Sequence, residues 1–570
     1  MTTFSPFDRH QTIYSRYGSY LSFTWRQNSL LMQSMYNGLG SDNMALFTLT
    51  LVDADGKDIP YDLHIDVDHA RMESERGHVI LYITGQDMVR VHGVGVGLRL
   101  TRATADRQFD NTFSPDGDRW EVNAYDSQIK VGLRTLQGSL SVDAPWNRVH
   151  SDDIMADFTP DDDFVFEAEM TLFRSVWVPD AIRPSTIDEA TKEAKASFED
   201  WLAATIPVPD AWQQGRYFAA YINWSAMLNP HGNFKRPAML MSKNWMNKVW
   251  SWDNCFNALA LVEQDPDLAW DQVMLFFDHQ DAQGAIPDHL TDATMSFRFC
   301  KPPIHGWTLR RLMAYPGVIT DARLNDIYAP LCRWTEWWLT YRDDDGDGIP
   351  QYNHGNESGW DNGTVFGENV PVESPDLCGY LVFQMDVLAE VAEKLGKSDE
   401  AATWGQRADD LCERMIAHFW NDTQFVPKHA NSHDVVAGDS SLVFMPLILG
   451  DRLPDHVREG LITNVKRFIT PHGIASEHPD SPFYEADGYW RGPIWAPSTH
   501  LLVDGLLACG ERDLALDICR RFCDMAQRSG MAENYDALNG DALRDRAYTW
   551  TASVFLLMGN LLWKAEQGQL

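Results

Sequence analysis

Several short stretches of the sequence combine carboxylates or a lysine with tryptophans, glycines and amides. They read WSWDNCF (250–256), KPPIHGW (301–307), GNESGWDNGTVFG (355–367), ADGYWRGPIWAPS (486–498) and MAENYDALNGD (531–541). Carboxylates and amides suit the paired hydroxyls of a sugar, and aromatic rings suit its apolar faces. Two carboxylates in one such pocket can act as general acid and general base if their surroundings separate their pKa values. Taken alone, the stretch ESGWDN (357–362) is better explained as a solvated surface turn than as a site.

A separate acidic stretch, DDDGDGIP (343–350), has the spacing of a calcium-binding loop. Asp343, Asp345 and Asp347 occupy positions 1, 3 and 5, and Gly348 occupies the turn. The twelfth position is His354, where such a loop has glutamate. Two interpretations therefore stay open: a structural calcium ion held by the three aspartates, or an acidic turn without metal.

The elements that position these residues fall into two halves with different periodicity. Residues 1–184 contain runs such as HVILYITG and FVFEAEMTLF, which are typical of strands and predict an antiparallel β-sandwich. Residues 185–206 read as a helical linker, and residues 207–570 as a mainly helical domain. The β-rich half shows no catalytic constellation.

The sequence contains clear start and end signals for one helix. Ser374 is the expected cap, Pro375 the first helical residue, and Gly396 lies just past the end. Paired helices of this kind form either a solenoid or a closed toroid of inner and outer helices. In a toroid, the long polar and aromatic loops gather at one end, where a rigid scaffold holds them.

Composition excludes several classes of function. The net charge of −35 argues against nucleic acid and, more weakly, against anionic membranes. The sequence contains no run of about 18 apolar residues, so we expect no membrane span. The N-terminus lacks the apolar region and cleavage site of a secretory signal, and the 8 cysteines form no C-x-x-C pair, so we expect reduced thiols in the cytoplasm.

The chain from about residue 208 to 565 resembles glycoside hydrolase family 63. The resemblance rests on the ordered motifs WDN (252–254), KPPIHGW (301–307), ESGWDN (357–362), SPDL (374–377), YWRGPIWAP (489–497) and ENY (533–535). Members of this family are inverting α-glycosidases with an (α/α)6 barrel, and many carry an N-terminal β-sandwich. They include α-glucosidases and mannosylglycerate hydrolases. The resemblance therefore implies a mainly α fold, with an (α/α)6-barrel catalytic domain after an antiparallel β-sandwich domain.

The resemblance also implies the roles of individual residues. Asp361 would be the general acid and Glu533 the general base, in separate loops that leave roughly 6.5–9.5 Å for a water molecule. The implied sugar-binding positions are Trp252, Asp253, His305, Trp360, Asn362, Trp490, Arg491 and Trp495. For Arg491 a structural ion pair is the alternative, and for His305 a hydrogen-bonded place in the scaffold.

The sequence thus predicts a cytoplasmic inverting glycoside hydrolase, an α-glucosidase acting on small oligosaccharides or glucosides without a required cofactor. An alternative is a mannosylglycerate or glucosylglycerate hydrolase, whose glycerate would need a basic subsite such as Lys301 or Arg491. Phosphorolysis would need a phosphate-binding pocket in place of the general base. The presence of Glu533 argues against it. A non-catalytic carbohydrate-binding protein would lack one of the two carboxylates. The sugar, its linkage and the oligomeric state stay open.

Overall fold

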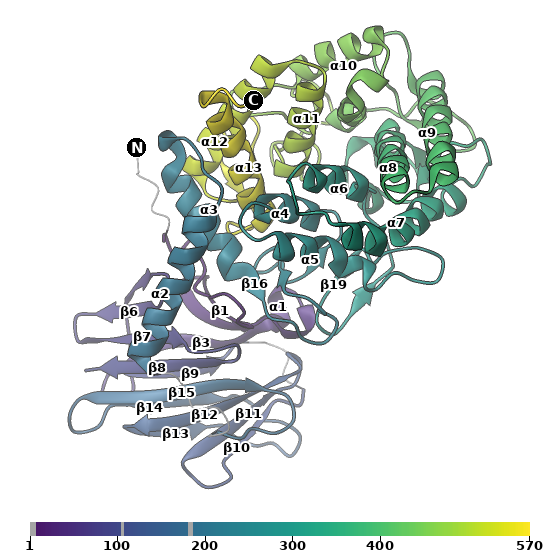
Figure 1. Ribbon diagram of the computed structural model, residues 1–570. Coiled ribbons are helices and arrows are strands. Elements are labelled where there is room, and N and C mark those ends of the chain that lie inside the picture. The colour runs from purple at the N-terminus through teal and green to yellow at the C-terminus, as the bar shows by residue number, and fades with distance from the viewer. Residues whose placement is uncertain (1–6, 104–107, 180–185) are drawn as a thin grey trace.

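The computed structural model describes residues 7–103, 108–179 and 186–570. It consists of an antiparallel β domain followed by a helical domain, as the sequence predicts (Figure 1). No helix among the described residues is long and apolar enough to cross a bilayer.

Two antiparallel sheets form the β domain. The first has the order β1 (Leu21–Arg26), β2 (Ser29–Ser34), β3 (Ala45–Val52), β9 (Gly97–Arg102), β14 (Met155–Thr159) and β13 (Ser139–Asp143), with β4 (Asp58–Ile59) paired to β3. The second has the order β10 (Asn111–Phe113), β11 (Arg119–Ala124), β12 (Ile129–Gln137), β15 (Val165–Phe173), β8 (Met88–Val94), β7 (Gly77–Ile83), β6 (Ala70–Ser74) and β5 (Asp62–Ile65). Phe158 of one sheet stacks on Phe166 of the other, with ring centroids 6.1 Å apart.

Helix α2 (Ile187–Ala204) leads from the β domain into the helical domain (Figure 1). Thr186 and Glu189 form a reciprocal capping box at its start. Its buried Phe198 packs edge-on against Tyr217 and Trp224 of α3 (Gln213–Ala226), at 5.2 and 5.5 Å between centroids. This apolar contact fixes the linker to the first helix of the domain that follows.

The remaining helices complete the second domain. They are α4 (Asp253–Leu261), α5 (Pro266–Phe277), α6 (His305–Met313), α7 (Asp321–Tyr341), α8 (Pro375–Lys394), α9 (Ser398–Phe419), α10 (Asp455–Arg467), α11 (Ala496–Ala508), α12 (Arg512–Ser529) and α13 (Thr549–Glu566). The segment Ser441–Arg452 is a 3-10 helix, η5. Contacts run from α4 through α6, α8, η5, α11 and α13 back to α4, so these segments form a closed ring rather than an open solenoid.

The start of α8 differs in one detail from the sequence-based expectation. Pro375 is its first residue, but the side chain of Ser374 makes no capping hydrogen bond. The Ser374 hydroxyl donates to the buried carboxylate of Asp376 instead, which also accepts from the hydroxyl of Tyr352 at 2.8 Å. A carboxylate in the first turn is favoured by the helix dipole.

Short strand pairs hold the loops at the ends of the helices. The pairs and small sheets are β16 (Met227–Leu228) with β17 (Ala238–Met239); β18 (Val249–Trp250), β19 (His289–Leu290) and β20 (Met295–Ser296); β21 (Gln351–Tyr352), β22 (Val372–Glu373) and β23 (Lys428–His429); and β24 (Asn534–Tyr535) with β25 (Ala542–Leu543). The candidate catalytic loops begin or end in these strands, so their backbones are fixed by hydrogen-bonded ladders.

Candidate active site

Glu357 is a structural residue of the loop that carries Asp361. The loop forms a short 3-10 helix, Gly355–Ser358, directly after β21. The side chain of Glu357 is 3% exposed and pairs with Arg342, whose Nη2 lies 2.7 Å from Oε1. The amide of Asn353 donates to its other oxygen at 2.8 Å. Both oxygens of Glu357 are therefore used to hold the loop.

Gly359 determines the turn that presents Asp361. Its φ is +76°, and a Cβ at this position would lie 2.6 Å from the indole of Trp252. Only glycine combines this backbone conformation with so close an approach. After the turn, Trp360 is buried at 1% exposure, while the side chain of Asp361 is 32% exposed. The turn therefore separates a buried indole from an accessible carboxylate.

Lys301 lies among three carboxylates. Its Nζ lies 3.6 Å from Asp361 and 3.6 Å from Asp288, and it donates to the carbonyl of Asn356 at 2.7 Å. Burial raises the pKa of Asp253 to about 8, while the positive charge of Lys301 opposes this shift. Asp253 is thus mostly protonated at neutral pH and can donate one hydrogen bond from a buried position.

Glu533 lies deeper than Asp361. The residue is 4% exposed and immediately precedes β24, and its amide donates to the carbonyl of Asp545 at 2.7 Å. Burial raises the pKa of Glu533 to about 7, and the charge of Asp545 adds to the rise. Arg544 and a hydrogen bond from Tyr489 act in the opposite direction. A carboxyl group with this pKa can take up a proton near neutral pH.

Tyr489 connects the two carboxylates electrostatically. Its pKa is raised well above the ordinary value, first by burial, then by Glu533, and then by Asp361. The guanidinium of Arg544 lies over its ring, 4.8 Å from the centroid. Two carboxylates from loops far apart in the sequence therefore both influence the charge of a single phenol.

A cluster of indoles fills the space under these loops. Trp490 stacks on Trp495 at 4.0 Å and on Trp360 at 4.7 Å between centroids. Trp252 contacts Trp550 edge-on at 6.1 Å. Each of Trp252, Trp360, Trp490 and Trp495 is at most 2% exposed. Their main contacts are with one another, and sugar binding by these four indoles stays a prediction.

The indole cluster bridges the two catalytic loops. Trp360 directly precedes Asp361 in the chain. The Nε1 of Trp550 donates to the carbonyl of Glu533 at 3.3 Å. The rigid aromatic packing therefore fixes the backbone beside each carboxylate.

Asn362 and Arg491 make contacts that hold loops together. The Asn362 amide donates to the carbonyl of Gly488 at 3.0 Å and accepts from the amide of Trp490 at 2.9 Å. Arg491 forms an ion pair with Glu485, with Nη2 2.7 Å from Oε2. These contacts are structural, and a sugar contact by either residue stays a prediction.

His305 lies in the core at the start of α6. It is 1% exposed and contacts Phe277 and Trp334 edge-on, at 5.4 and 6.4 Å between centroids. Burial lowers its pKa to about 4, so the imidazole is neutral. Among the described residues neither ring nitrogen has a hydrogen-bond partner, so the expected hydrogen-bonded scaffold place is not found, and a sugar contact by His305 stays a prediction.

In the acidic loop, Asp343 makes different contacts from Asp345 and Asp347, whereas in a calcium site all three would bind one ion. Asp343 accepts the amides of Gly346 and Gly348 at 2.9 and 3.1 Å. Asp345 and Asp347 lie with Glu373 and His433, and ligand-type atoms of these four residues are all within 4.8 Å of one another. Calcium binding by the three aspartates stays a prediction.

The sequence patterns do not single out Tyr489, Asp288 or Asp545. Tyr489 is adjacent to Trp490 within a quoted motif, so the motif locates it without giving its role. Asp288 follows Pro287 in a stretch without distinctive spacing, and Asp545 lies in ALRDRAY among alternating charges. Their importance depends on contacts across the fold that local patterns do not encode.

Comparisons with known proteins point to glycoside hydrolases. A family model described as the mannosylglycerate hydrolase MGH1-like glycoside hydrolase domain matches residues 246–551. Mannosylglycerate hydrolase MGH2 of Selaginella moellendorffii is 23% identical over 412 residues, which cover 58% of this chain and 82% of that protein. Glucosylglycerate hydrolase of Mycolicibacterium hassiacum is 22% identical over 413 residues, covering 54% of this chain and 91% of that protein.

Solved structures share the fold. The family 63 mannosylglycerate hydrolase from Thermus thermophilus in complex with glucose has a TM-score of 0.52 at 20% identity, and the match covers 59% of this chain and 98% of that chain. A bacterial glucoamylase complexed with acarbose has a TM-score of 0.63 at 11% identity, covering 97% of this chain and 94% of that chain. The glucoamylase match therefore extends over both domains.

Proposed function

Because this chain belongs to glycoside hydrolase family 63, we propose that it hydrolyses α-glucosidic bonds of small oligosaccharides or glucosides with inversion at the anomeric carbon. Asp361 is the general acid and Glu533 the general base. The convergence of both carboxylates on Tyr489 carries this proposal. The closed ring of inner helices supports the further proposal that the helical domain is an (α/α)6 barrel.

In the proposed reaction, the Asp361 carboxyl gives its proton to the glycosidic oxygen, and the bond from the anomeric carbon to that oxygen breaks. Water attacks the anomeric carbon from the opposite face, and Glu533 takes the proton that the water loses. Asp361 is left ionised and Glu533 protonated, and exchange with solvent restores both. Lys301, 3.6 Å from Asp361, stabilises the negative charge that remains.

The division of roles follows the family motifs ESGWDN and ENY. The accessible Asp361 can reach the leaving group, and the enclosed Glu533 can hold a single water. The pKa of about 7 gives Glu533 both an ionised fraction at neutral pH and a useful basicity.

The basic side chains near the candidate site already pair with carboxylates. This supports a substrate whose leaving group is uncharged, because a charged glycerate would need a free basic group. Lys301 is surrounded by carboxylates, Arg491 pairs with Glu485, and Arg544 lies 2.6 Å from Asp487. A glycerate carboxylate would have to displace one of these partners. Lys301 and Arg491, the two candidates for a glycerate subsite, are therefore already engaged.

Hydrolysis of mannosylglycerate or glucosylglycerate is the second candidate, because relatives are named for these activities. A panel of α-linked glucose disaccharides, glucosylglycerate and mannosylglycerate, read by released monosaccharide, separates the two. We expect at least one disaccharide to be hydrolysed with a higher kcat/KM than either glycerate compound. Hydrolysis confined to the glycerate compounds would replace the α-glucosidase proposal with the second candidate.

A further inference from the structure

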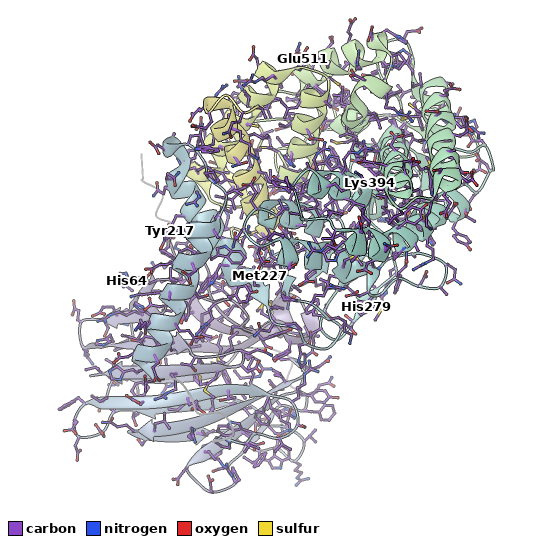
Figure 2. The ribbon with its side chains drawn as sticks, viewed as in Figure 1. His64, Tyr217, Met227, His279, Lys394 and Glu511 are labelled. Atoms are coloured by element: carbon purple, nitrogen blue, oxygen red, sulfur yellow. The ribbon has the colours of Figure 1, made fainter. Side chains whose placement is uncertain are left out.

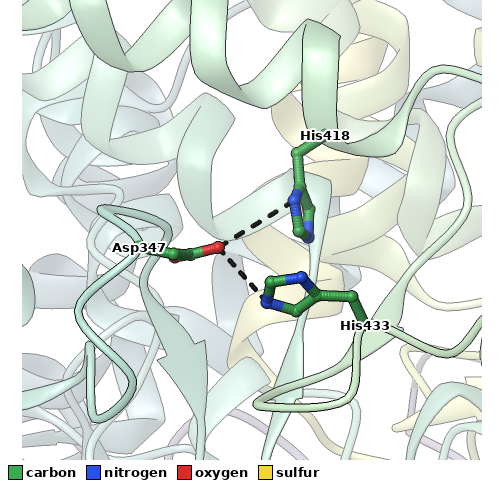
Figure 3. A group of neighbouring side chains, drawn as sticks. All are labelled: Asp347, His418 and His433. Atoms are coloured by element: carbon green, nitrogen blue, oxygen red, sulfur yellow. Dashed lines mark ion pairs between the residues drawn. The ribbon is translucent and has the colours of Figure 1, made fainter.

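Two histidines and three carboxylates meet at the acidic loop (343–350), which supplies two of the carboxylates. We call Asp345, Asp347, Glu373, His418 and His433 the His433 cluster. Asp345 and Asp347 lie between α7 and β21, Glu373 is in β22, His418 is near the end of α9, and His433 follows β23. Figure 3 shows both imidazoles turned toward Asp347.

The spacing of the ligand atoms suits a small cation. Nε2 of His433 lies 3.3 Å from an oxygen of Asp345, 3.4 Å from one of Asp347 and 3.8 Å from one of Glu373. Ligands at about 2.0–2.1 Å from a tetrahedral zinc ion are separated by roughly 3.4 Å. An ion can therefore lie among these four atoms after only small side-chain adjustments.

Glu373 gives an independent indication of a missing partner. Its side chain is fully buried, and its Oε1 has no hydrogen-bond partner within the described residues although it faces His433. A buried carboxylate oxygen without a partner is costly. The other oxygen, Oε2, accepts from Nε2 of His418 at 2.7 Å. Metal-bound carboxylates are commonly oriented by such an outer hydrogen bond.

We propose that Asp345, Asp347, Glu373 and His433 bind one divalent transition-metal ion of the zinc type, with His418 orienting Glu373. An imidazole nitrogen among carboxylate oxygens suits zinc, whereas calcium is bound by oxygen ligands. The oxygens of Asp343 accept the backbone amides of Gly346 and Gly348. The proposed zinc site therefore uses Asp345 and Asp347, which also fit the calcium-loop spacing. Its other two ligands, Glu373 and His433, come from other segments.

The ion would fasten three segments that are remote in the sequence. It would join the loop before β21, strand β22 and the segment after β23, which already form one small sheet. Strand β21 leads directly into the loop of Asp361. Binding should therefore raise the thermal stability of the whole chain, and this can be measured without any substrate.

Calorimetric titration of chelator-treated protein with Zn²⁺ tests the site. We expect one ion per chain and a higher Tm after binding. His433→Asn should weaken Zn²⁺ binding at least about tenfold, since it removes the only nitrogen ligand. Asparagine suits this position because the φ of His433 is +55°, a conformation that asparagine tolerates better than most residues.

Two further variants locate the ion. His429→Asn is the matched control, because the imidazole of His429 lies 3.8 Å from the carboxylate of Glu368, which is not a proposed ligand; this variant should bind Zn²⁺ like the wild type. Asp343→Asn should also leave Zn²⁺ binding unchanged. The proposal is overturned if Zn²⁺ does not bind or if His433→Asn binds it normally. It is equally overturned if the chain binds Ca²⁺ more tightly than Zn²⁺ and loses the ion in Asp343→Asn.

Discussion

At the scale of single residues, the surroundings give two carboxylates different chemistry. Glu533 is enclosed and has a pKa near 7, whereas Asp361 is partly exposed beside the cation of Lys301. Neither feature follows from the residue types alone. The roles proposed for these residues therefore depend on burial and charge, and both can be tested by substitution.

The first prediction concerns the two roles directly. Asp361→Asn and Glu533→Gln should each lower kcat at least about a hundredfold, the contribution typical of a general acid or base. Circular dichroism and the Tm should show that both variants fold. Near wild-type turnover by either variant would remove that residue from the mechanism.

Glu357→Gln is the control from the same loop. Glu357 pairs with Arg342 in a buried position, so loss of its charge should lower the free energy of unfolding by about 3 kcal/mol. The kcat per folded molecule should change far less than in Asp361→Asn. A hundredfold loss of kcat at unchanged stability would mean that Glu357, not Asp361, is the catalytic residue of the loop.

The second prediction concerns pH. The active enzyme needs Glu533 ionised and Asp361 protonated, so one limb of the pH dependence of kcat/KM should have an apparent pKa near 7, the value for Glu533. Arg544→Gln removes a positive charge that lowers this pKa and should move this limb to higher pH. Asp545→Asn removes a negative charge and should move it to lower pH. Shifts of the same sign in both variants would exclude Glu533 as the titrating group.

At the scale of elements, short loops locked by hydrogen bonds and indoles present the site. The loop around Asp361 is held by Arg342 behind Glu357 and by the close approach of Gly359 to Trp252. Asn362 then joins it to the loop of Tyr489. The position of Asp361 should therefore respond to changes in the turn that do not touch its carboxylate.

The third prediction uses this turn. Gly359→Ala should lower both the Tm and kcat, because a Cβ at φ +76° costs about 1–2 kcal/mol and would also collide with the indole of Trp252. Gly317→Ala is the matched control: its φ is +77°, and a Cβ there meets nothing within 4 Å. Equal losses of Tm and unchanged kcat in both variants would show that the contact with Trp252 does not position Asp361.

Much of the element structure could be predicted from the sequence, because periodicity reports burial directly. Strand β8 alternates buried and partly exposed residues along MVRVHGV, and α8 begins at Pro375 as expected. The lack of a serine cap on α8 could not be predicted, because the Ser374 hydroxyl bonds to the Asp376 carboxylate rather than to the backbone. Glu373 and His433 lie 60 positions apart, so their meeting depends on the packing of whole segments.

At the scale of the whole molecule, one buried lysine joins the two domains. Nζ of Lys243 donates to Ser15, Arg16 and Ser19 of the N-terminal segment and to the carbonyl of Met227 in β16. Met227 lies where the helical domain meets the β domain (Figure 2). The lysine is completely buried, so no water replaces these bonds if it is removed.

The fourth prediction tests this junction. Lys243→Met should lower the free energy of unfolding by about 3 kcal/mol, because it leaves several buried oxygens without a donor. Lys235→Met is the control, since Lys235 is exposed and donates only to the carbonyl of Gly232, at 3.0 Å. Denaturant unfolding measures both. Equal stability of the two variants would show that the Lys243 contacts do not hold the domains together.

A chain of hydrogen bonds connects the β domain with the surroundings of Glu533. Thr24 of β1 donates to the side chain of Asn244 at 2.8 Å, and Asn244 donates to Asp545 at 3.3 Å. Asp545 in turn accepts the amide of Glu533 and raises its pKa. Through Thr24 and Asn244, the N-terminal half therefore helps to hold the Asp545 carboxylate that raises the pKa of Glu533.

The stereochemistry of the first product tests the central claim, a single displacement by water with Glu533 as base. A retaining enzyme instead holds its carboxylates roughly 5–5.5 Å apart and forms a covalent glycosyl-enzyme intermediate. Proton NMR of the anomeric signals, recorded in the first minutes of fast hydrolysis of an α-glucoside, distinguishes the two before mutarotation mixes the anomers. We predict that the β-anomer of glucose appears first. Initial release of the α-anomer would contradict both inversion and the role of Glu533.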